Sequence, residues 1–211
     1  MRFLASPPAN LVLASREPDA DCPFNIVQNA CCAAFAHASP HTPWLVQPAC
    51  FRSQGRLQAA RRLRDVVRNV AQSLPADAFK RFFNELMRGV SDLVNSKQND
   101  DRAAGVCAIH ELIDVRLRED ESKFIRFAGS LRGVFASSTC DEATIRQASS
   151  AFGKLARAGS GLKAEIVNFE LTNSLDRMRP GTKSTTFRLA AMLVLRETAI
   201  NAPTFFNQRV G

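Results

Sequence analysis

Three stretches of this sequence repeat at a constant offset of about 43 residues, and this repeat restricts the fold more than any other feature. They read CAIHELI (107–113), SAFGKLA (150–156) and LVLRETA (193–199). In this register, positions i, i+4, i+7 and i+8 carry small or apolar side chains, the spacing of one buried helical face. The aligned columns are Gly105, Ala148 and Ala191; Ile109, Phe152 and Leu195; Leu112, Leu155 and Thr198; and Ile113, Ala156 and Ala199. Thr198 interrupts its column, but a buried threonine hydroxyl can bond to a carbonyl of its own helix.

A second apolar stripe follows each of the first two repeated helices. These stripes are Phe124, Phe127, Leu131, Val134 and Phe135, and then Ile166, Val167, Leu171, Leu175 and Met178. A repeat of roughly 40 to 47 residues that consists of two helices is typical of HEAT and armadillo proteins. The sequence therefore predicts an all-α fold, an α-solenoid of HEAT-type antiparallel helix pairs. The alternative is an ordinary helical bundle with accidental self-similarity.

An earlier helix pair precedes the repeats. Its apolar stripes are Leu63, Val66, Val67, Val70, Ala71 and Leu74, and then Phe79, Phe82, Phe83, Leu86, Val90, Leu93 and Val94. Pro75 ends the first stripe, because proline cannot continue a helix. We expect helix N-caps at Asp77, Ser122 and Asp141. The predicted pairs span 56–95, 101–136, 141–178 and, incompletely, 183–211.

Residues 1–55 differ from the rest of the chain. Seven of the ten prolines fall between residues 7 and 48, and no apolar periodicity is present there. We expect 1–55 to be an irregular, disordered segment and 56–211 to be the solenoid. The net charge of +8 belongs to the second part, since three basic and three acidic residues balance in the first. No stretch has the length of a signal peptide's apolar region or a membrane span, so we expect a cytoplasmic protein without membrane insertion.

The end of the chain resembles an interrupted pair. Pro203 follows the third repeated helix and is placed to start its partner. By the spacing of the other pairs, that partner would be centred beyond Gly211. Phe205 and Phe206 are not the polar outer face expected of a terminal repeat. We therefore expect a solenoid truncated at its C-terminal end.

Several groups of residues resemble catalytic or phosphate-binding sites of other proteins, but each has a simpler structural explanation here. Cys107, His110, Glu111 and Asp114 could suggest a hydrolase, but the repeat places the first two beside the core stripe. The stretch FGKLA has Leu155 where a phosphate loop needs Ser or Thr. We interpret its glycine as a close-packed helix position and its lysine as a solvated charge. The turn residues Gly159, Ser160 and Gly161 after Arg157 form a helix C-cap in this interpretation.

The cysteines and the arginines also have a chemical and a structural interpretation. No pair of cysteines has CxxC spacing, so we expect free thiols rather than a zinc site with His37 and His41. The remaining cysteines are Cys22, Cys31, Cys32, Cys50 and Cys140. Arg61, Arg62, Arg64, Arg68, Lys80, Arg81 and Arg88 form a basic face on the first two helices. Because Phe79, Phe82 and Phe83 are predicted to point inward, we expect this face to meet an acidic neighbour rather than nucleic acid. We predict no catalytic, cofactor or metal residue.

Four segments resemble the N-terminal HEAT repeats of the TOR (target of rapamycin) kinases. They are GVCAIHELIDV, SKFIRFAGSLRGVF, FGKLARAG with AEIVNFE, and RLAAMLVLRETAINAPTFFNQRV. The resemblance covers about residues 77 to 210 in unbroken order. It implies part of a large serine/threonine protein kinase of the phosphatidylinositol-kinase-related group, whose solenoid is scaffold for protein partners.

The resemblance also implies what this chain lacks and what it binds. The catalytic residues, ATP and magnesium belong to a kinase domain outside this sequence, so the chain should not phosphorylate anything. The implied partners are a Raptor-like subunit and the rest of a TOR complex, with association to endomembranes through those partners. The alternative function is a freestanding HEAT adaptor of the transport or phosphatase-scaffold type. A basic nucleic-acid-binding protein is a third class, which predicts affinity that falls steeply with salt.

Overall fold

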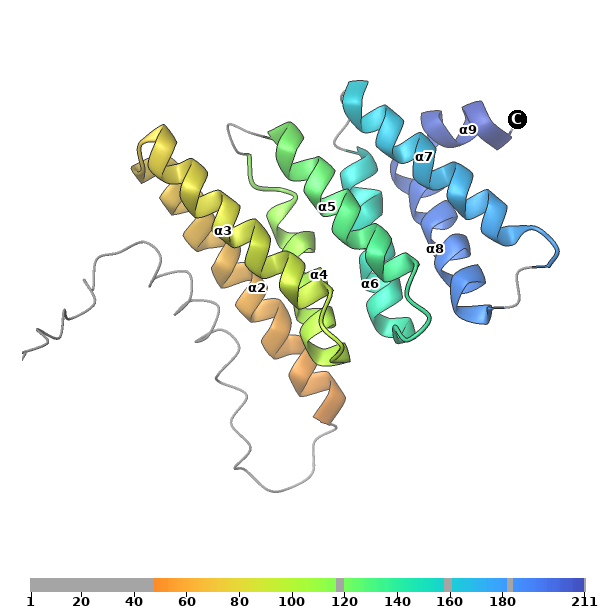
Figure 1. Ribbon diagram of the computed structural model, residues 1–211, viewed down its shortest axis with the longest axis horizontal. Coiled ribbons are helices and arrows are strands. Elements are labelled where there is room, and N and C mark those ends of the chain that lie inside the picture. The colour runs from red at the N-terminus through yellow and green to blue at the C-terminus, as the bar shows by residue number, and fades with distance from the viewer. Residues whose placement is uncertain (1–47, 117–119, 158–160, 182–183, 211) are drawn as a thin grey trace, which may run out of the picture.

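The computed structural model describes residues 48–116, 120–157, 161–181 and 184–210, and its helices stack in two layers (Figure 1). The first layer is α2 (Pro48–Ser73), α4 (Asn99–Leu112), α6 (Glu142–Arg157) and α8 (Thr185–Asn201). The second layer is α3 (Ala76–Val94), α5 (Asp120–Phe135), α7 (Gly161–Met178) and α9 (Pro203–Val210). The described residues contain no strand. The predicted all-α solenoid is confirmed, whereas the repeat period and the division into two segments stay predictions.

The two layers interlock between neighbouring pairs. α3 packs against α4, α5 against α6, and α7 against α8, so the second helix of each pair lies on the first helix of the next pair. Gly105 on α4 shows why its column holds small residues. A Cβ at Gly105 would lie 2.7 Å from Cγ2 and 2.8 Å from the backbone N of Val94 on α3. Any side chain there would push the two helices apart.

Close approach also occurs within the first layer. A Cβ at Gly153 on α6 would lie 3.1 Å from Cβ and 3.2 Å from the carbonyl oxygen of Glu197 on α8. The prediction that the glycine of FGKLA is a close-packed helix position is therefore confirmed. Its neighbour Lys154, predicted to be a solvated charge, is partly exposed and also bridges α6 to Asp114, just beyond the end of α4.

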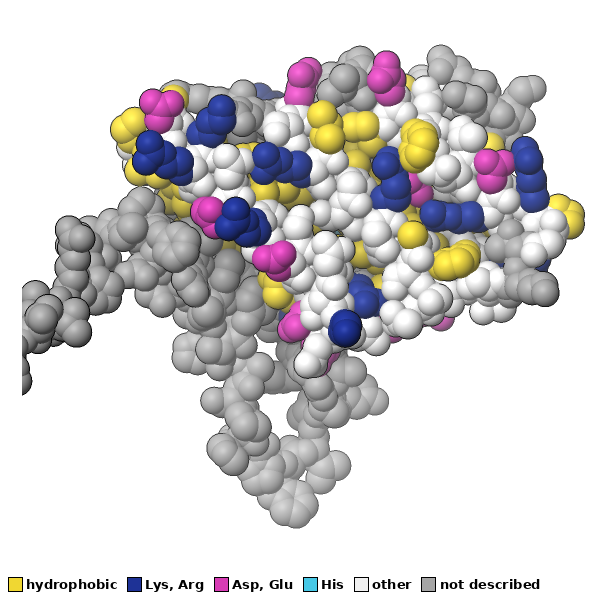
Figure 2. Space-filling model, in the orientation of Figure 1, with side chains coloured by type: hydrophobic (Ala, Val, Ile, Leu, Met, Phe, Trp, Pro, Cys, Tyr) yellow, Lys and Arg dark blue, Asp and Glu magenta, His cyan; other side chains and the backbone are white. Residues whose placement is uncertain are grey.

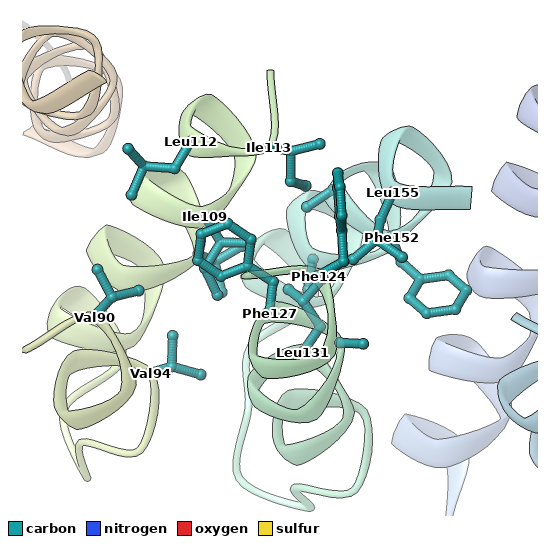
Figure 3. Packing of buried hydrophobic residues seen from close by; sticks show 14 of the residues in the cluster. Val90, Val94, Ile109, Leu112, Ile113, Phe124, Phe127, Leu131, Phe152 and Leu155 are labelled. Atoms are coloured by element: carbon teal, nitrogen blue, oxygen red, sulfur yellow. The ribbon is translucent and has the colours of Figure 1, made fainter. Parts of the chain in front are cut away.

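The core lies between the two layers, as Figure 3 shows for α3, α4, α5 and α6. Ile109, Phe152 and Leu155, which belong to the repeated columns, are all buried. Thr198 is also buried, and its hydroxyl donates to the carbonyl of Val194 at 2.8 Å, as the sequence predicted. Leu195, the third member of the large apolar column, is only half-buried. The repeated columns therefore lie on the core side of each helix, less deeply in α8.

The stripe predicted on α7 is partly wrong. Its buried side is Val167, Glu170, Leu171 and Ser174, whereas Met178 is 40% exposed. Glu170 lies on this side because its carboxylate accepts a hydrogen bond from Arg132 on α5 at 3.1 Å. Met178 shares the helical face of Leu171, seven residues earlier, but it is the last residue of α7, where the helix ends.

The helix ends match the predictions in one case of three. Asp141 caps α6, since its Oδ1 accepts from the backbone N–H of Thr144 at 2.7 Å. Asp77 and Ser122 are not caps, because α3 begins at Ala76 and α5 at Asp120 and both residues lie inside those helices. α8 has an N-cap that the sequence analysis missed, the Ser184 hydroxyl, which accepts from the backbone N–H of Phe187.

The last helix begins where the sequence indicated. α9 starts at Pro203, after Ala202 ends α8. Phe205 and Phe206 are half-buried against the core, rather than fully exposed. α9 therefore contributes apolar area to the packing of α7 and α8.

Candidate interaction surface

The residues that could suggest a hydrolase take part in packing between helices. Cys107 is 3% exposed, and its Sγ accepts a hydrogen bond from Nε2 of Gln147 on α6 at 2.7 Å. Burial raises the pKa of the Cys107 thiol above its ordinary value. A nucleophilic cysteine needs the opposite shift, toward the thiolate. Cys107 therefore packs α4 against α6, in agreement with the structural interpretation of this residue.

His110 and its neighbours form a polar network that joins three helices of the first layer. Lys154 on α6 binds Asp114 at 3.0 Å and also reaches the His110 carbonyl at 3.4 Å. On the other side, Glu111 accepts from Nη1 of Arg64 on α2 at 2.7 Å. Burial, with a further contribution from the Lys154 ammonium, lowers the pKa of His110. The polar groups that sequence analysis singled out thus hold α2, α4 and α6 together.

The predicted basic face divides between the two layers. On α2, Arg64 pairs with Glu111 and Arg56 pairs with Asp100 on α4 at 3.0 Å. Of the predicted basic face, Arg64 thus meets an acid of the next pair, as expected. Arg61 and Arg62 remain exposed. The three phenylalanines of α3 point inward, as predicted.

Arg81 and Arg88 of α3 belong instead to a groove of the second layer. The groove has a volume of 740 Å³, and we call it the α3–α5 groove. Its lining consists of Arg81, Asn84, Glu85, Met87, Arg88 and Ser91 from α3, and Arg126 from α5. At one end, the hydroxyls of Ser91 and Ser130 lie 3.2 Å apart and join the two helices. Figure 2 shows Lys and Arg side chains spread over this face of the molecule, with hydrophobic side chains between them.

A second polar cluster links α5 to α7. Glu170 is 1% exposed and is paired with Arg132 at 3.1 Å and with Arg177 at 3.7 Å. The Arg132 guanidinium also stacks over the exposed ring of Phe169, 4.4 Å from its centroid, a cation–π contact. Sequence reasoning missed this cluster. The available signal was Glu170 itself, an acid between Val167 and Leu171 on an apolar stripe.

Two negative findings apply to the described residues alone. Within those ranges, no helix is both long and apolar enough to cross a membrane. The same ranges hold no group of three or more His, Cys, Asp or Glu side chains suited to a metal ion. Cys22, Cys31, Cys32, His37 and His41 lie outside the described residues, as do Gly159, Ser160 and the side chain of Cys50.

Comparisons with known proteins agree with the resemblance found in the sequence. No family model matches the chain. It is 31% identical to the serine/threonine-protein kinase TOR of Arabidopsis thaliana over 79% of its length, and 33% identical to that of Oryza sativa subsp. japonica over 77%. It is 30% identical to the serine/threonine-protein kinase tor1 of Schizosaccharomyces pombe over 71%. This chain is related to a segment of the TOR kinases. It spans only 6–7% of the length of these relatives.

The relation to TOR kinases changes how the surfaces are interpreted. The relatives are serine/threonine kinases by name, but the matched segment is a small part of each. The chemistry of the whole relative therefore cannot be assigned to the residues described here. Two exposed features among the described residues of this TOR-related segment are the α3–α5 groove and the arginine–phenylalanine stack on α5 and α7. These make the second layer the candidate interaction surface.

Proposed function

We propose that this chain is a protein–protein interaction scaffold in TOR-type signalling and that it transfers no phosphate itself. The observation that carries the proposal is the relation to TOR kinases over most of this chain, which corresponds to 6–7% of their length. A solenoid presents long surfaces on both layers, which suits the docking of other proteins. The polar side chains that could suggest catalysis are engaged in helix packing, which supports a scaffold role.

The partners we propose are a Raptor-like subunit and the remainder of a TOR complex. The proposed organisation is an irregular segment at 1–55 followed by a solenoid module at 56–211. We place the protein in the cytoplasm, with association to endomembranes through its partners. In this proposal the kinase activity belongs to the full-length relatives, and this chain supplies docking surface.

The test is a binding and competition experiment with the whole chain. We expect the purified chain to co-elute with a recombinant Raptor-like subunit in size-exclusion chromatography, and to displace full-length TOR kinase from that subunit in a pull-down. Incubation with radiolabelled ATP and a protein substrate should give no incorporation of phosphate. A chain that binds no subunit of a TOR complex would contradict the proposal. Binding to a transport or phosphatase subunit instead would support the freestanding adaptor.

A further inference from the structure

We propose that the α3–α5 groove binds an acidic segment of a partner protein through Arg81, Arg88 and Arg126. The proposal names the partner chemistry at the candidate interaction surface, and so it rests on the proposed scaffold function. The groove has three guanidinium groups in its lining and a single carboxylate, that of Glu85. A ligand that completes this surface must bring negative charge.

The arginines of the groove differ in how they are paired. Arg88 lies 3.5 Å from Glu85, one turn away on the same helix, and both side chains are largely exposed to solvent. Such an exposed pair contributes little, so Arg88 can exchange Glu85 for a carboxylate of a ligand. Arg81 and Arg126 form no ion pair with any residue that the structure describes. Among the described residues, the groove therefore offers two guanidinium groups without an acidic partner and a third that is weakly held.

Two arginines elsewhere in the molecule show how such a side chain can be paired between helices. Arg64 reaches Glu111 at 2.7 Å, and Arg132 reaches Glu170 at 3.1 Å. In both cases the carboxylate is buried and the arginine joins neighbouring helices. At the α3–α5 groove, α5 contributes Arg126 to a lining that already holds two arginines of α3, and no acid of α5 belongs to that lining. Among the described residues, no acid of a neighbouring helix pairs with the groove arginines, as Glu111 and Glu170 do with Arg64 and Arg132.

The shape of the groove favours a peptide segment over an isolated anion. Met87 belongs to the lining but is only 2% exposed, whereas the side chain of Ile125, next to Arg126 in the sequence, is 49% exposed. Gly129, one turn beyond Arg126, has nothing within 4 Å of a Cβ built on it. Because Gly129 has no side chain, no side chain protrudes from α5 at this point, and the backbone of a ligand can approach the helix closely. Acidic side chains of such a segment can meet the arginines, which come from both α3 and α5.

Other polyanions fit these features less well. Binding of single-stranded nucleic acid needs aromatic side chains on which bases stack. The exposed ring of Phe169 in the second layer is covered by Arg132 and does not belong to the groove lining. Binding to an anionic membrane uses a protruding basic surface, whereas the arginines here line a concavity between two helices. Both ligands are nevertheless included below as outcomes.

The test uses the whole chain and a defined probe. The probe is a fluorescein-labelled amphipathic peptide with Leu along one helical face and Glu elsewhere, and its partner has every Glu replaced by Gln. We expect the acidic peptide to bind in a fluorescence-anisotropy titration, with an affinity that falls as salt is added. The double variant Arg81→Glu, Arg126→Glu should weaken binding about tenfold or more, because repulsion replaces attraction at two positions.

A matched control separates the groove from general attraction to a basic protein. The double variant Arg61→Glu, Arg62→Glu makes the same change of charge on exposed residues of α2. It should change the affinity less than about twofold. Circular dichroism melts should show that both double variants remain folded. Equal loss in the two variants, or equal binding of the Gln peptide, would overturn the proposal.

Two further measurements distinguish between possible ligands and test the proposed groove ligand separately from the proposed scaffold function. Tighter binding of phosphatidylserine vesicles or of a single-stranded oligonucleotide, lost in the groove variant, would assign the groove to that ligand and overturn the acidic segment. The wild-type chain is also mixed with the Raptor-like subunit. If the wild-type chain binds the subunit but the peptide does not bind the groove, the scaffold function stands and this inference fails. If the peptide binds the groove but no TOR-complex subunit binds the chain, the scaffold function fails.

Discussion

The two layers of the molecule place the same kinds of residue in different roles. In the first layer, Arg64 and Lys154 cross to carboxylates of the neighbouring pair, and Gly153 lets α6 and α8 touch. In the second layer, Arg81 and Arg126 line an open groove, and Gly129 faces empty space. At these positions the first layer uses polar and small residues for cohesion, whereas the α3–α5 groove leaves them available, although Arg132 and Glu170 also join α5 to α7 within the second layer. The difference indicates that side-chain type alone does not reveal whether a residue serves packing or docking.

The largest effect should come from the shared core, on which both layers depend. Leu155 is a fully buried side chain that packs between the layers. Leu155→Ala should lower the free energy of unfolding by about 2–5 kcal/mol, because it leaves a cavity in the core. Urea denaturation followed by circular dichroism is the measurement.

A matched control for this core variant lies on α5. Ile125 is half-exposed. Ile125→Ala should therefore change the free energy of unfolding by less than about 0.5 kcal/mol, as is usual for surface substitutions. A cost below about 0.5 kcal/mol for Leu155→Ala itself would mean that its column does not form the core.

Tight glycine packing gives the next largest effect. Gly105→Ala adds a methyl group 2.7 Å from Val94 Cγ2. It should destabilise the protein by about 1–3 kcal/mol, because α3 and α4 must separate. The measurement is the midpoint of urea unfolding at constant slope. An unchanged or raised midpoint would show that the close approach of α3 and α4 is not needed for stability.

Removal of ion pairs should show the difference between the two layers more clearly. Arg64→Ala leaves the buried Glu111 carboxylate without its closest partner. The substitution should cost about 1–2 kcal/mol, less than the loss of a fully buried pair because Arg64 is partly solvated. Arg88→Ala removes only an exposed pair with Glu85. That substitution should cost less than about 0.5 kcal/mol.

Thermal melts of the Arg64 and Arg88 variants make this comparison. A larger fall in melting temperature for Arg64→Ala is the expected result. Equal costs would break the distinction between a cohesive first layer and an open second layer.

Gly129→Ala should act in the opposite direction from Gly105→Ala. Nothing lies within 4 Å of the added methyl group. The gain in helix propensity should therefore raise stability by about 0.5–1 kcal/mol. The same denaturation experiment applies. A loss of stability would show that α5 is packed at Gly129 rather than free.

The smallest effect concerns pH and the His110 network. Burial, with the help of Lys154, lowers the pKa of His110 in the folded state, so the unfolded chain takes up a proton first as the pH falls. The contribution of His110 to stability is therefore present above the ordinary histidine pKa of about 6.5 and is lost as the pH falls through the lowered folded-state pKa. Melting temperatures from about pH 7.5 to about pH 5 should fall more in the wild-type chain than in His110→Gln. Parallel curves would exclude this role for His110.

The features that follow from apolar periodicity could be predicted from the sequence. The buried positions Ile109, Phe152 and Leu155 and the back-bonded Thr198 were all predicted from the repeat. The relation to TOR kinases was likewise visible in short sequence words, and the comparisons confirm it. The errors concern polar residues. Asp77 is not the cap that the sequence predicted, because a cap depends on one or two backbone angles at the helix start, which periodicity does not fix.

The candidate site was harder to predict than the fold. The basic residues of α2 and α3 looked like one continuous face, yet the structure pairs Arg64 with Glu111, leaves Arg61 and Arg62 exposed, and places Arg81 and Arg88 in the α3–α5 groove. Lys123 was not recognised as buried, although it is 1% exposed and donates to the carbonyls of Ile113 and Val115, beyond the end of α4. A burial of this kind depends on which acceptors a neighbouring helix brings, and a single helix does not contain that information.

The sequence by itself determined that this chain folds as paired helices in an α-solenoid and that it is related to TOR kinases. It did so because helix formation and the choice of buried face depend on residues three or four positions apart, which one segment contains. Only the tertiary structure decided which arginines find a carboxylate, which glycines are in contact and where a groove remains open. Those outcomes depend on residues far apart in the chain, such as Arg64 and Glu111, and are fixed only when the layers pack together.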